Sequence, residues 1–309
     1  MKKNILITGA NGLVGSSLIR YLSNKNFEIT GTFNKNKKNL IKKKNIKYIQ
    51  CNITNRKALK ELFKKKRFDI VINSAAILKS KENNFSSSIE MFDDNVKIQK
   101  NLLRQSVNSN VGQFIFLSSI SIYEGIKKNE KFHEDQNYQL KSIYALSKVT
   151  CENFLENTAN SSNLKGISLR LAGVHGIGKK SGVIYNMFNQ AHKGGTIQVN
   201  EPNSVFRLTF LEDINKAIDL IIKRKMLNKY KVYNLAGEEI YNLKKLGKVI
   251  IKLCKKGKLK LLKNSKIRYQ VLNINKFKKD YKYKPTALLK KLKNYNEHYK
   301  NTNNLDFNN

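Results

Sequence analysis

Short apolar runs alternate with segments of helical periodicity along residues 4–170. The runs are apolar throughout, which is typical of strands that are covered on both faces. In the segments between them, apolar side chains recur at helical spacing, as in Leu13 to Leu22. This alternation predicts an α/β fold with a doubly wound parallel sheet, the Rossmann fold. The expected strands are 4–8, 27–32, 46–50, 69–73, 113–118 and 166–170, and the expected helices are 13–22, 55–66, 90–108 and 142–156.

Glycines at intervals of three residues lie between the first expected strand and the first expected helix, in Thr8-Gly9-Ala10-Asn11-Gly12-Leu13-Val14-Gly15. The first permits a tight turn, the second lets the backbone approach a pyrophosphate, and the third allows close helix–strand packing. The helix start adds unpaired N–H groups and a favourable dipole. A plain turn is the alternative, but the position at the first strand–helix junction favours dinucleotide binding. The expected cofactor contacts here are Gly9, Asn11, Gly12, Leu13, Val14 and Gly15.

After Arg170 glycines break the pattern into short pieces. We therefore expect residues 1–172 to form the dinucleotide-binding domain, and residues 173–309 to form mainly a smaller C-terminal substrate-binding lobe. Residues 207–236 are expected to return to the first domain, with a helix at 211–223 and a strand at 231–235. A lysine-rich helical tail follows.

Tyr144 and Lys148 lie four residues apart in an expected helix, so their side chains share one face. A neighbouring ammonium favours the phenolate, so we expect Lys148 to lower the pKa of Tyr144 toward neutrality. Tyr144 could then exchange a proton with a hydroxyl while hydride moves to or from a nicotinamide. Ser119 ends an expected strand at the carboxyl edge of the sheet, where ligands bind in such folds.

These motifs together resemble the extended short-chain dehydrogenases/reductases, also called the NAD-dependent epimerase/dehydratase family, which act on nucleotide sugars. The GxxGxxG turn, the Tyr-x-x-x-Lys pair and the intervals from Ser119 to Tyr123 and Tyr144 carry the resemblance, over about residues 1–240. It implies that Ser119, Tyr144 and Lys148 are catalytic, with Ser119 holding the reacting oxygen and Tyr144 acting as acid and base. It also implies that Tyr144 and Lys148 contact the nicotinamide end of the cofactor. Further contacts implied by the resemblance are Asn52 and Ile53 beside the adenine, and Ala75, Ala76 and Asn95 along the cofactor cleft.

Two departures from the family pattern narrow the activity. Dehydratases of this family carry acidic residues directly after the catalytic Ser or Thr, where this chain has Ile120 and Ser121. The fucose-forming epimerase/reductases use a cysteine in place of Ser121. A 4-epimerase and a keto-sugar reductase or dehydrogenase remain, and the same residues fit both. A reductase of a small non-sugar carbonyl and a non-catalytic dinucleotide sensor stay open as alternatives.

The residues at the end of the second expected strand do not decide between NAD and NADP. A carboxylate there normally holds the ribose hydroxyls of NAD. This chain has Asn34, followed by Lys35, Lys37 and Lys38. The pattern predicts NAD(P) with NADP slightly favoured over NAD, and a solvated lysine loop is the alternative interpretation.

The formal net charge of +38 invites a nucleic-acid interpretation. Lysine outnumbers arginine by 52 to 8, whereas surfaces that read bases favour arginine. The basic residues are also spread along the chain, so we expect no specific nucleic-acid partner. A positive surface does attract anions such as sugar diphosphates. The expected partner is a nucleotide sugar or another small molecule, and the family resemblance adds a possible homodimer.

The sequence also indicates where the protein resides and whether it binds a metal ion. No apolar run is long enough to span a bilayer, and the N-terminal apolar stretch is too short for a signal peptide. We expect a cytoplasmic protein without a membrane partner. Cys51, Cys151 and Cys254 are isolated, and the four histidines lack metal-ligand spacing, so no disulfide framework or metal site is expected. Arg207 lies six rather than seven residues before Asp213 and is not assigned to phosphate binding.

Overall fold

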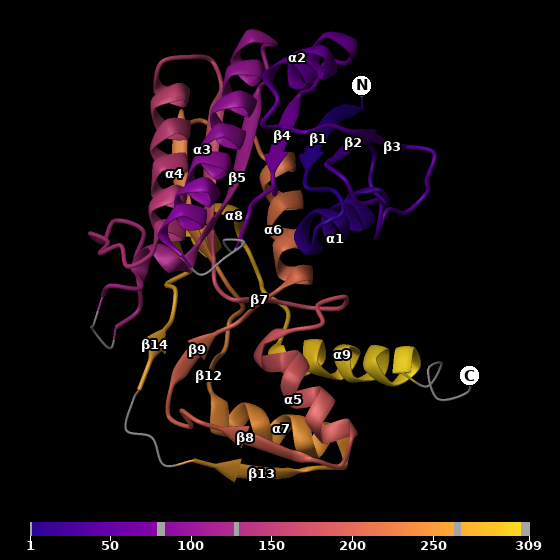
Figure 1. Ribbon diagram of the computed structural model, residues 1–309, viewed down its shortest axis with the longest axis vertical. Coiled ribbons are helices and arrows are strands. Elements are labelled where there is room, and N and C mark those ends of the chain that lie inside the picture. Colours follow the sequence, from indigo (N-terminus) through magenta and orange to yellow (C-terminus); the bar gives the residue numbers. More distant parts are fainter. Residues whose placement is uncertain (1, 79–83, 127–129, 263–266, 304–309) are drawn as a thin grey trace. The chain divides into compact units, whose positions relative to one another are not determined.

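The computed structural model describes residues 2–78, 84–126, 130–262 and 267–303 (Figure 1). The chain divides into two compact units. The first consists of Met1–Lys127, Glu134–Leu171 and Asn215–Asn234, and the second of Lys128–His133, Ala172–Ile214 and Leu235–Asn309.

The first unit is built on a seven-stranded sheet with the order β11-β6-β5-β4-β1-β2-β3, in which the neighbours from β6 to β3 run parallel. Chain order runs one way from β1 to β3 and the other way from β4 to β6. Ligands bind at such a reversal, beyond the carboxyl ends of the strands. The Rossmann prediction is confirmed. The strands are β1 (Lys3–Thr8), β2 (Phe27–Phe33), β3 (Ile46–Gln50), β4 (Ile70–Asn73), β5 (Gln113–Ser119), β6 (Lys165–Leu171) and β11 (Tyr230–Leu235).

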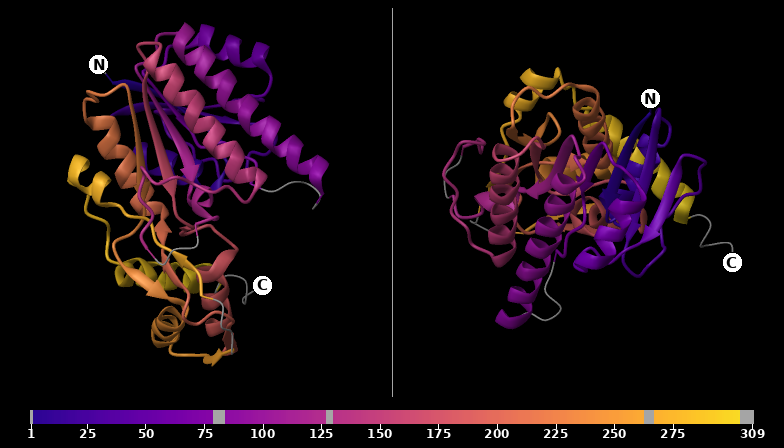
Figure 2. Two further views of the ribbon diagram at one scale, coloured as in Figure 1. Left: turned by 90° about the vertical axis from the view of Figure 1, so that its left-hand side faces the viewer. Right: turned by 90° about the horizontal axis from the view of Figure 1, so that it is seen from above.

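Helices cover both faces of this sheet, as Figure 2 shows in two directions. One face carries α1 (Leu13–Leu22) and α6 (Leu211–Lys223), which are joined where Asn215 Nδ2 donates to Ser17 Oγ at 2.9 Å. The other face carries α2 (Arg56–Lys65), α3 (Phe85–Asn108) and α4 (Ile143–Asn160). These three helices share one apolar core with the strands beneath them. Its members include Leu6, Leu59, Val71, Leu102, Phe114, Phe116 and Leu155.

Polar caps set the starts of these helices. The Asn84 side chain accepts from Ser87 N at 2.8 Å, so α3 begins at Phe85 rather than at the expected residue 90. The serines of this first turn carry no apolar periodicity, which is why the sequence placed the start too late. Ser142 caps α4 by accepting from Ala145 N at 3.1 Å.

The second unit has its own apolar core, in which α5 (Gly182–His192), α7 (Leu243–Cys254) and α9 (Leu288–Asn303) pack with β8 (Thr196–Val199). Helix α5 was not predicted from the sequence because glycines surround it. Its buried residues nevertheless recur at helical spacing: Ile184, Met187, Phe188 and Ala191. The remaining elements of this unit are β7 (Val174–His175), β9 (Val205–Arg207), β10 (Thr209–Phe210), β12 (Ile240–Asn242), β13 (Lys258–Leu261), β14 (Tyr269–Gln270) and α8 (Asn275–Tyr281).

A buried ion pair fastens α4 to β6. Arg170 Nη2 lies 2.7 Å from Glu152 Oε2, and Arg170 Nη1 donates to the Tyr123 hydroxyl at 2.7 Å. That hydroxyl donates in turn to Asn234 Oδ1 at 3.1 Å. Burial opposes the charge on Arg170, but Glu152 and Tyr123 outweigh it and raise the pKa of the guanidinium. The pair therefore stays ionised, and its loss leaves a charge without a partner.

We predict that Arg170→Met lowers the free energy of unfolding by about 3–5 kcal/mol, because Glu152 then remains buried and unpaired. Urea denaturation measures this change. The matched control is Lys64→Met, which breaks the exposed pair between Lys64 Nζ and Glu61 Oε1 at 3.1 Å and should change little. Equal effects of the two substitutions would contradict the prediction.

Candidate active site

The glycine-rich turn owes its shape to two close backbone contacts. Gly9 has a φ of +66°, and a Cβ on Gly15 would lie 2.2 Å from the carbonyl oxygen of Gly9. A side chain at Gly12 would meet only that oxygen, at 3.2 Å. Gly12 is exposed and forms the N-cap of α1 without a side-chain hydrogen bond. The first N–H groups of α1 are therefore left for a ligand.

A cavity of about 320 Å³ opens beside this turn. Its walls come from the ends of β1 to β4 and from α3, all in the first unit. Of the expected cofactor contacts, Gly9, Asn11, Gly12, Asn34, Asn52, Ile53, Ala75 and Ala76 line it. The sequence analysis did not single out its other lining residues, which are Thr32, Phe33, Cys51, Thr54, Ser74, Ile77, Asp94 and Ile98. Most of these residues lie at or just after the end of an expected strand, and this position in the sequence could have predicted them.

Asn95 does not line the cavity, but its side chain fixes the backbone of Ile77, which does. Its Oδ1 accepts from Ile77 N at 2.8 Å and its Nδ2 donates to Ile77 O at 2.9 Å. Asn101, further along α3, donates from Nδ2 to Ile53 O at 3.0 Å and to Thr54 O at 3.1 Å. Both amides are buried. Side chains of α3 thus hold the two loops that follow β3 and β4.

A chain of buried hydrogen bonds links the turn to α4. Thr8 Oγ1 donates to Asn73 Oδ1 at 2.8 Å, and Asn73 Nδ2 donates to Gln99 Oε1 at 2.8 Å. Gln99 Nε2 donates to Cys151 O at 3.2 Å. Because every donor points the same way, the bonds polarise one another and fix the orientation of both amides. The network joins the end of β1, the end of β4, α3 and α4.

The loop after β2 is tied to the turn through Asn11. Asn11 Nδ2 donates to Asn36 O at 2.8 Å, and Asn39 Nδ2 donates to Asn11 O at 3.2 Å. Asn39 takes a φ of +64° to make this contact. These two hydrogen bonds therefore hold the loop after β2 against the glycine-rich turn.

The three expected catalytic residues lie together at the carboxyl end of β5 and the start of α4. Ser119 Oγ accepts from Ser121 N at 3.1 Å, and its interaction with the Tyr144 hydroxyl lowers the pKa of that hydroxyl. Lys148 Nζ donates to Leu117 O at 2.9 Å and lies 5.5 Å from the centroid of the Tyr144 ring. Lys148 is only 4% exposed, so its ammonium is held in one place.

The pKa of Tyr144 differs from the expectation. Burial raises it to about 12, although the hydrogen bond from Ser119 acts in the opposite direction. Burial also lowers the pKa of Lys148 to about 8. The expectation that Lys148 brings Tyr144 toward neutrality is therefore wrong for the protein by itself. Removal of water from the phenolate outweighs the interaction with Ser119, and the neighbouring Cys151 and Glu124 raise the pKa further.

A scan against protein-family models matches residues 5–236 to the NAD dependent epimerase/dehydratase family. The chain belongs to this family. A UDP-glucose 4-epimerase of Vibrio cholerae is 27% identical over 229 residues, which is 72% of this chain and 66% of that protein. A UDP-glucose 4-epimerase of Thermotoga maritima, solved with UDP-glucose, has a TM-score of 0.83 at 21% identity, covering 97% of this chain and 99% of its own. A dTDP-glucose 4,6-dehydratase of Bacillus anthracis, solved with NAD, has the same TM-score and identity and covers 97% of each chain.

Membership makes the chain an enzyme of the epimerase/dehydratase family, but the fold does not separate the family's activities, because an epimerase and a dehydratase are equally similar to it. The residues after Ser119 are more informative. Ile120 and Ser121 form a short 3-10 turn with no carboxylate. Glu124, which no sequence motif indicated, raises the pKa of Tyr144 through its charge, and its Oε2 accepts from Ser142 Oγ at 3.4 Å.

Two residues of the second unit have structural roles. Arg207 is buried and donates to Leu272 O at 2.7 Å and to Glu238 O at 2.8 Å. His175 is buried, its ring centroid lies 6.2 Å from that of Phe210, and burial lowers its pKa to about 3.

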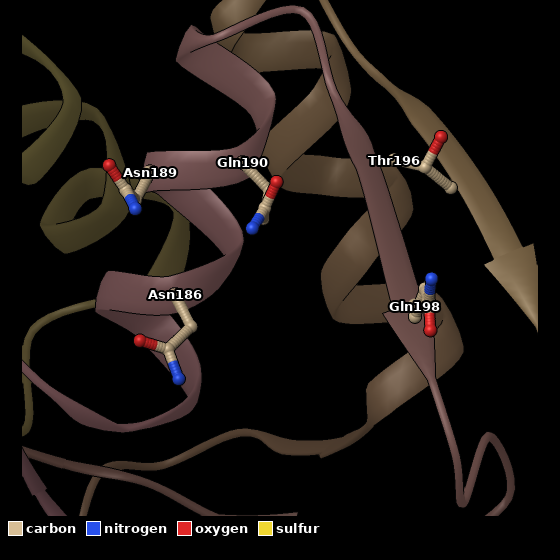
Figure 3. Close-up of a pocket in the computed structure, with 5 residues that line it drawn as sticks. All are labelled: Asn186, Asn189, Gln190, Thr196 and Gln198. Atoms are coloured by element: carbon tan, nitrogen blue, oxygen red, sulfur yellow. The ribbon is translucent and has the colours of Figure 1, made fainter.

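A second hollow of about 530 Å³ lies in the second unit between α5 and β8 (Figure 3). Its lining is uncharged and consists of Asn186, Asn189, Gln190, Thr196 and Gln198. Among the described residues, no group of three His, Cys, Asp or Glu side chains could hold a metal ion. No helix in the described ranges is long and apolar enough to cross a membrane.

We predict that Gly15→Ala destabilises the protein by about 2 kcal/mol or more, because its methyl group would overlap the Gly9 carbonyl. Gly12→Ala should lower the free energy of unfolding by less, about 1 kcal/mol, since its methyl group would meet the same oxygen at 3.2 Å rather than 2.2 Å and the N-cap preference changes only modestly. Thermal and urea unfolding of both variants measures which substitution destabilises the protein more. A larger effect at Gly12 would contradict the assignment of these two glycines.

Proposed function

We propose that this protein transfers hydride on a nucleotide-linked sugar with NAD(P), as a 4-epimerase or as a keto-sugar reductase. The observation that carries the proposal is the cluster of Ser119, Tyr144 and Lys148 at the carboxyl edge of the sheet that also bears the cavity. Similarity to UDP-glucose 4-epimerases supports the sugar class.

In the proposed mechanism, the Ser119 hydroxyl holds the oxygen that reacts, and Tyr144 takes its proton. A bound oxidised nicotinamide supplies a hydride acceptor and a positive charge. That charge would favour the Tyr144 phenolate, whose pKa of about 12 is otherwise too high for a base at neutral pH. Loss of the hydroxyl proton and of the carbon-bound hydride leaves a ketone. A 4-epimerase then returns the hydride to the opposite face of that carbon and the proton to the oxygen. A reductase performs only this return step, starting from the ketone.

The competing activities fit less well. A dehydratase would need an acid directly after Ser119, and Ile120 and Ser121 supply none. A sensor that only binds dinucleotide would not need a buried lysine beside a tyrosine. Reduction of a small non-sugar carbonyl uses the same residues and remains the alternative. A substrate-binding role for residues 173–309, a homodimer and a cytoplasmic location stay predictions.

The test is a pair of single-atom substitutions. Tyr144→Phe should lower kcat for interconversion of UDP-glucose and UDP-galactose by about 100-fold or more, because the acid/base group is lost. NAD should still bind, since the ring is retained. Tyr138→Phe is the matched control, on a tyrosine of the same unit outside the catalytic cluster, and should keep full activity.

The pH dependence gives a second readout for the same residue. Because only the phenolate accepts a proton, kcat for the oxidation half-reaction should rise with pH toward the pKa of Tyr144. Ultraviolet titration without cofactor should show a step near pH 12 that Tyr144→Phe reduces by the amplitude of one tyrosine, because Tyr123 and Tyr295 also have pKa values of about 12. The proposed function is refuted if the unaltered protein shows no turnover and binds no dinucleotide.

The proposal includes both forms of the dinucleotide. Asn34 lines the cavity where a carboxylate would repel a 2′-phosphate, and Lys35 and Lys37 are exposed beside it. We expect NADP to bind at least as tightly as NAD at low salt and to weaken more steeply as salt rises, because exposed charges are screened.

Calorimetric titration at two salt concentrations checks this expectation. The double variant Lys35→Gln/Lys37→Gln should lose the extra salt dependence, whereas Lys64→Gln/Lys65→Gln on α2 should keep it. Much weaker binding of NADP than of NAD at low salt would show that the lysines do not serve the cofactor.

A further inference from the structure

Glu124 connects the two elements that carry the catalytic residues. It directly follows the short 3-10 turn Ile120–Tyr123, and its backbone N donates to Ser121 O at 3.1 Å. Ser119 precedes that turn and accepts from Ser121 N at 3.1 Å. On the other side, Glu124 Oε2 accepts from the hydroxyl of Ser142, which caps α4, at 3.4 Å. The side chain thus joins the turn after β5 to the start of α4.

The direction of this hydrogen bond is set by the helix cap. Ser142 Oγ accepts from Ala145 N at 3.1 Å, so the single hydrogen of the hydroxyl is the one that it donates to Glu124. Burial raises the pKa of Glu124, whereas Ser142 and Lys141 act in the opposite direction. The side chain is exposed, so the carboxylate is ionised at neutral pH. Glu124 therefore brings a negative charge to the start of the helix that carries Tyr144.

The backbone is held in place on both sides of Glu124. Gly125 N donates to Gln139 O at 2.9 Å, and a Cβ on Gly125 would lie 2.2 Å from that oxygen. Tyr123 is fully buried, and its hydroxyl accepts from Arg170 Nη1 at 2.7 Å. The Glu124 backbone is therefore fixed next to the loop that leads into α4.

Glu124 is the acid whose charge acts on Tyr144 at neutral pH. The pKa of this tyrosine is raised by burial, by Cys151 and by Glu124, and it is lowered by Ser119. Burial raises the pKa of the Cys151 thiol to about 12, so the thiol is uncharged at neutral pH. Lys148 is the cation on the same helix, with its Nζ 5.5 Å from the centroid of the ring. Glu124 thus supplies the negative charge that opposes formation of the phenolate.

We propose that Glu124 keeps Tyr144 protonated until a positively charged nicotinamide cofactor is bound. Glu124 is then a positioning residue, because it acts on the reacting oxygen only through Tyr144. The carboxylate and a bound oxidised nicotinamide act on Tyr144 in opposite directions, so removal of the substrate proton is coupled to occupancy of the cofactor site. The inference rests on the proposed function and adds a residue that determines when the base forms.

Three substitutions of exposed side chains separate the charge from the structure. Glu124→Gln keeps an oxygen that can accept from Ser142 but removes the charge. Glu124→Asp keeps the charge and serves as the rescue. The matched control is Glu156→Gln, which removes the same charge from an exposed position on α4, about three turns beyond Tyr144.

The first measurement is the ultraviolet titration of tyrosine without cofactor. Each variant is titrated with and without Tyr144→Phe, so that the difference isolates Tyr144, whose step lies near pH 12 in the unaltered protein. Glu124→Gln should move the midpoint of this difference to lower pH, because the phenolate no longer meets a negative charge. The displacement should shrink as salt rises. Glu124→Asp and Glu156→Gln should leave the midpoint in place.

The second measurement is the rate of NADH formation from UDP-glucose in a single turnover, as a function of pH. Below the midpoint of its pH profile, Glu124→Gln should raise this rate about twofold to fivefold, as expected for one partly screened surface charge. Glu124→Asp and Glu156→Gln should retain the rate and the profile of the unaltered protein.

The two measurements together distinguish the possible roles of Glu124. If Glu124→Gln lowers the rate at every pH without changing the profile, the residue only supports the fold and the inference is overturned. A titration midpoint that Glu124→Gln does not move also overturns it, and both results leave the proposed function in place. If the unaltered protein forms no NADH and binds no dinucleotide, the proposed function is wrong and this inference is wrong with it.

Discussion

The order of the site depends on buried amide side chains of α3. Asn95, Gln99 and Asn101 are buried, so each must find its partners within the protein. Their partners are backbone groups of the loops after β3 and β4, the side chain of Asn73, and the backbone of α4. One helix therefore sets the spacing between the cavity and the helix that carries Tyr144. An apolar α3 would pack against the sheet equally well, but it would leave these loops without fixed positions.

Electrostatics divides the site into two regions. Around Tyr144 the groups are dehydrated, and burial favours the neutral forms of both Tyr144 and Lys148. The cavity beside the glycine-rich turn is lined by one charged side chain, Asp94, in a protein of net charge +38. A general positive field attracts anions such as phosphates to the surface of the protein.

The sequence predicted the first unit well because its signals are local. Continuous apolar strands and the glycine spacing require no knowledge of distant residues, and they placed β1 to β6 and the turn within a few positions. Asp94 was not found because only pairing across the fold brings α3 to the ends of β2 and β3. The two-residue strands β7 and β10 likewise exist through their partners. The pKa of Tyr144 also depends on burial, which the spacing of Tyr144 and Lys148 does not reveal.

The reciprocal bonds between Asn11 and the loop after β2 have a consequence for protein engineering. A designer who exchanges only residues 34–38 would retain Asn39, which binds Asn11, and would replace the Asn36 side chain, whose Oδ1 accepts from Lys38 N. The transplanted segment would then have to present its backbone carbonyl to Asn11 without the turn that this side chain stabilises. The loop and Asn11 form one exchangeable module, and cofactor preference in this scaffold should be transferred as that module rather than as single substitutions.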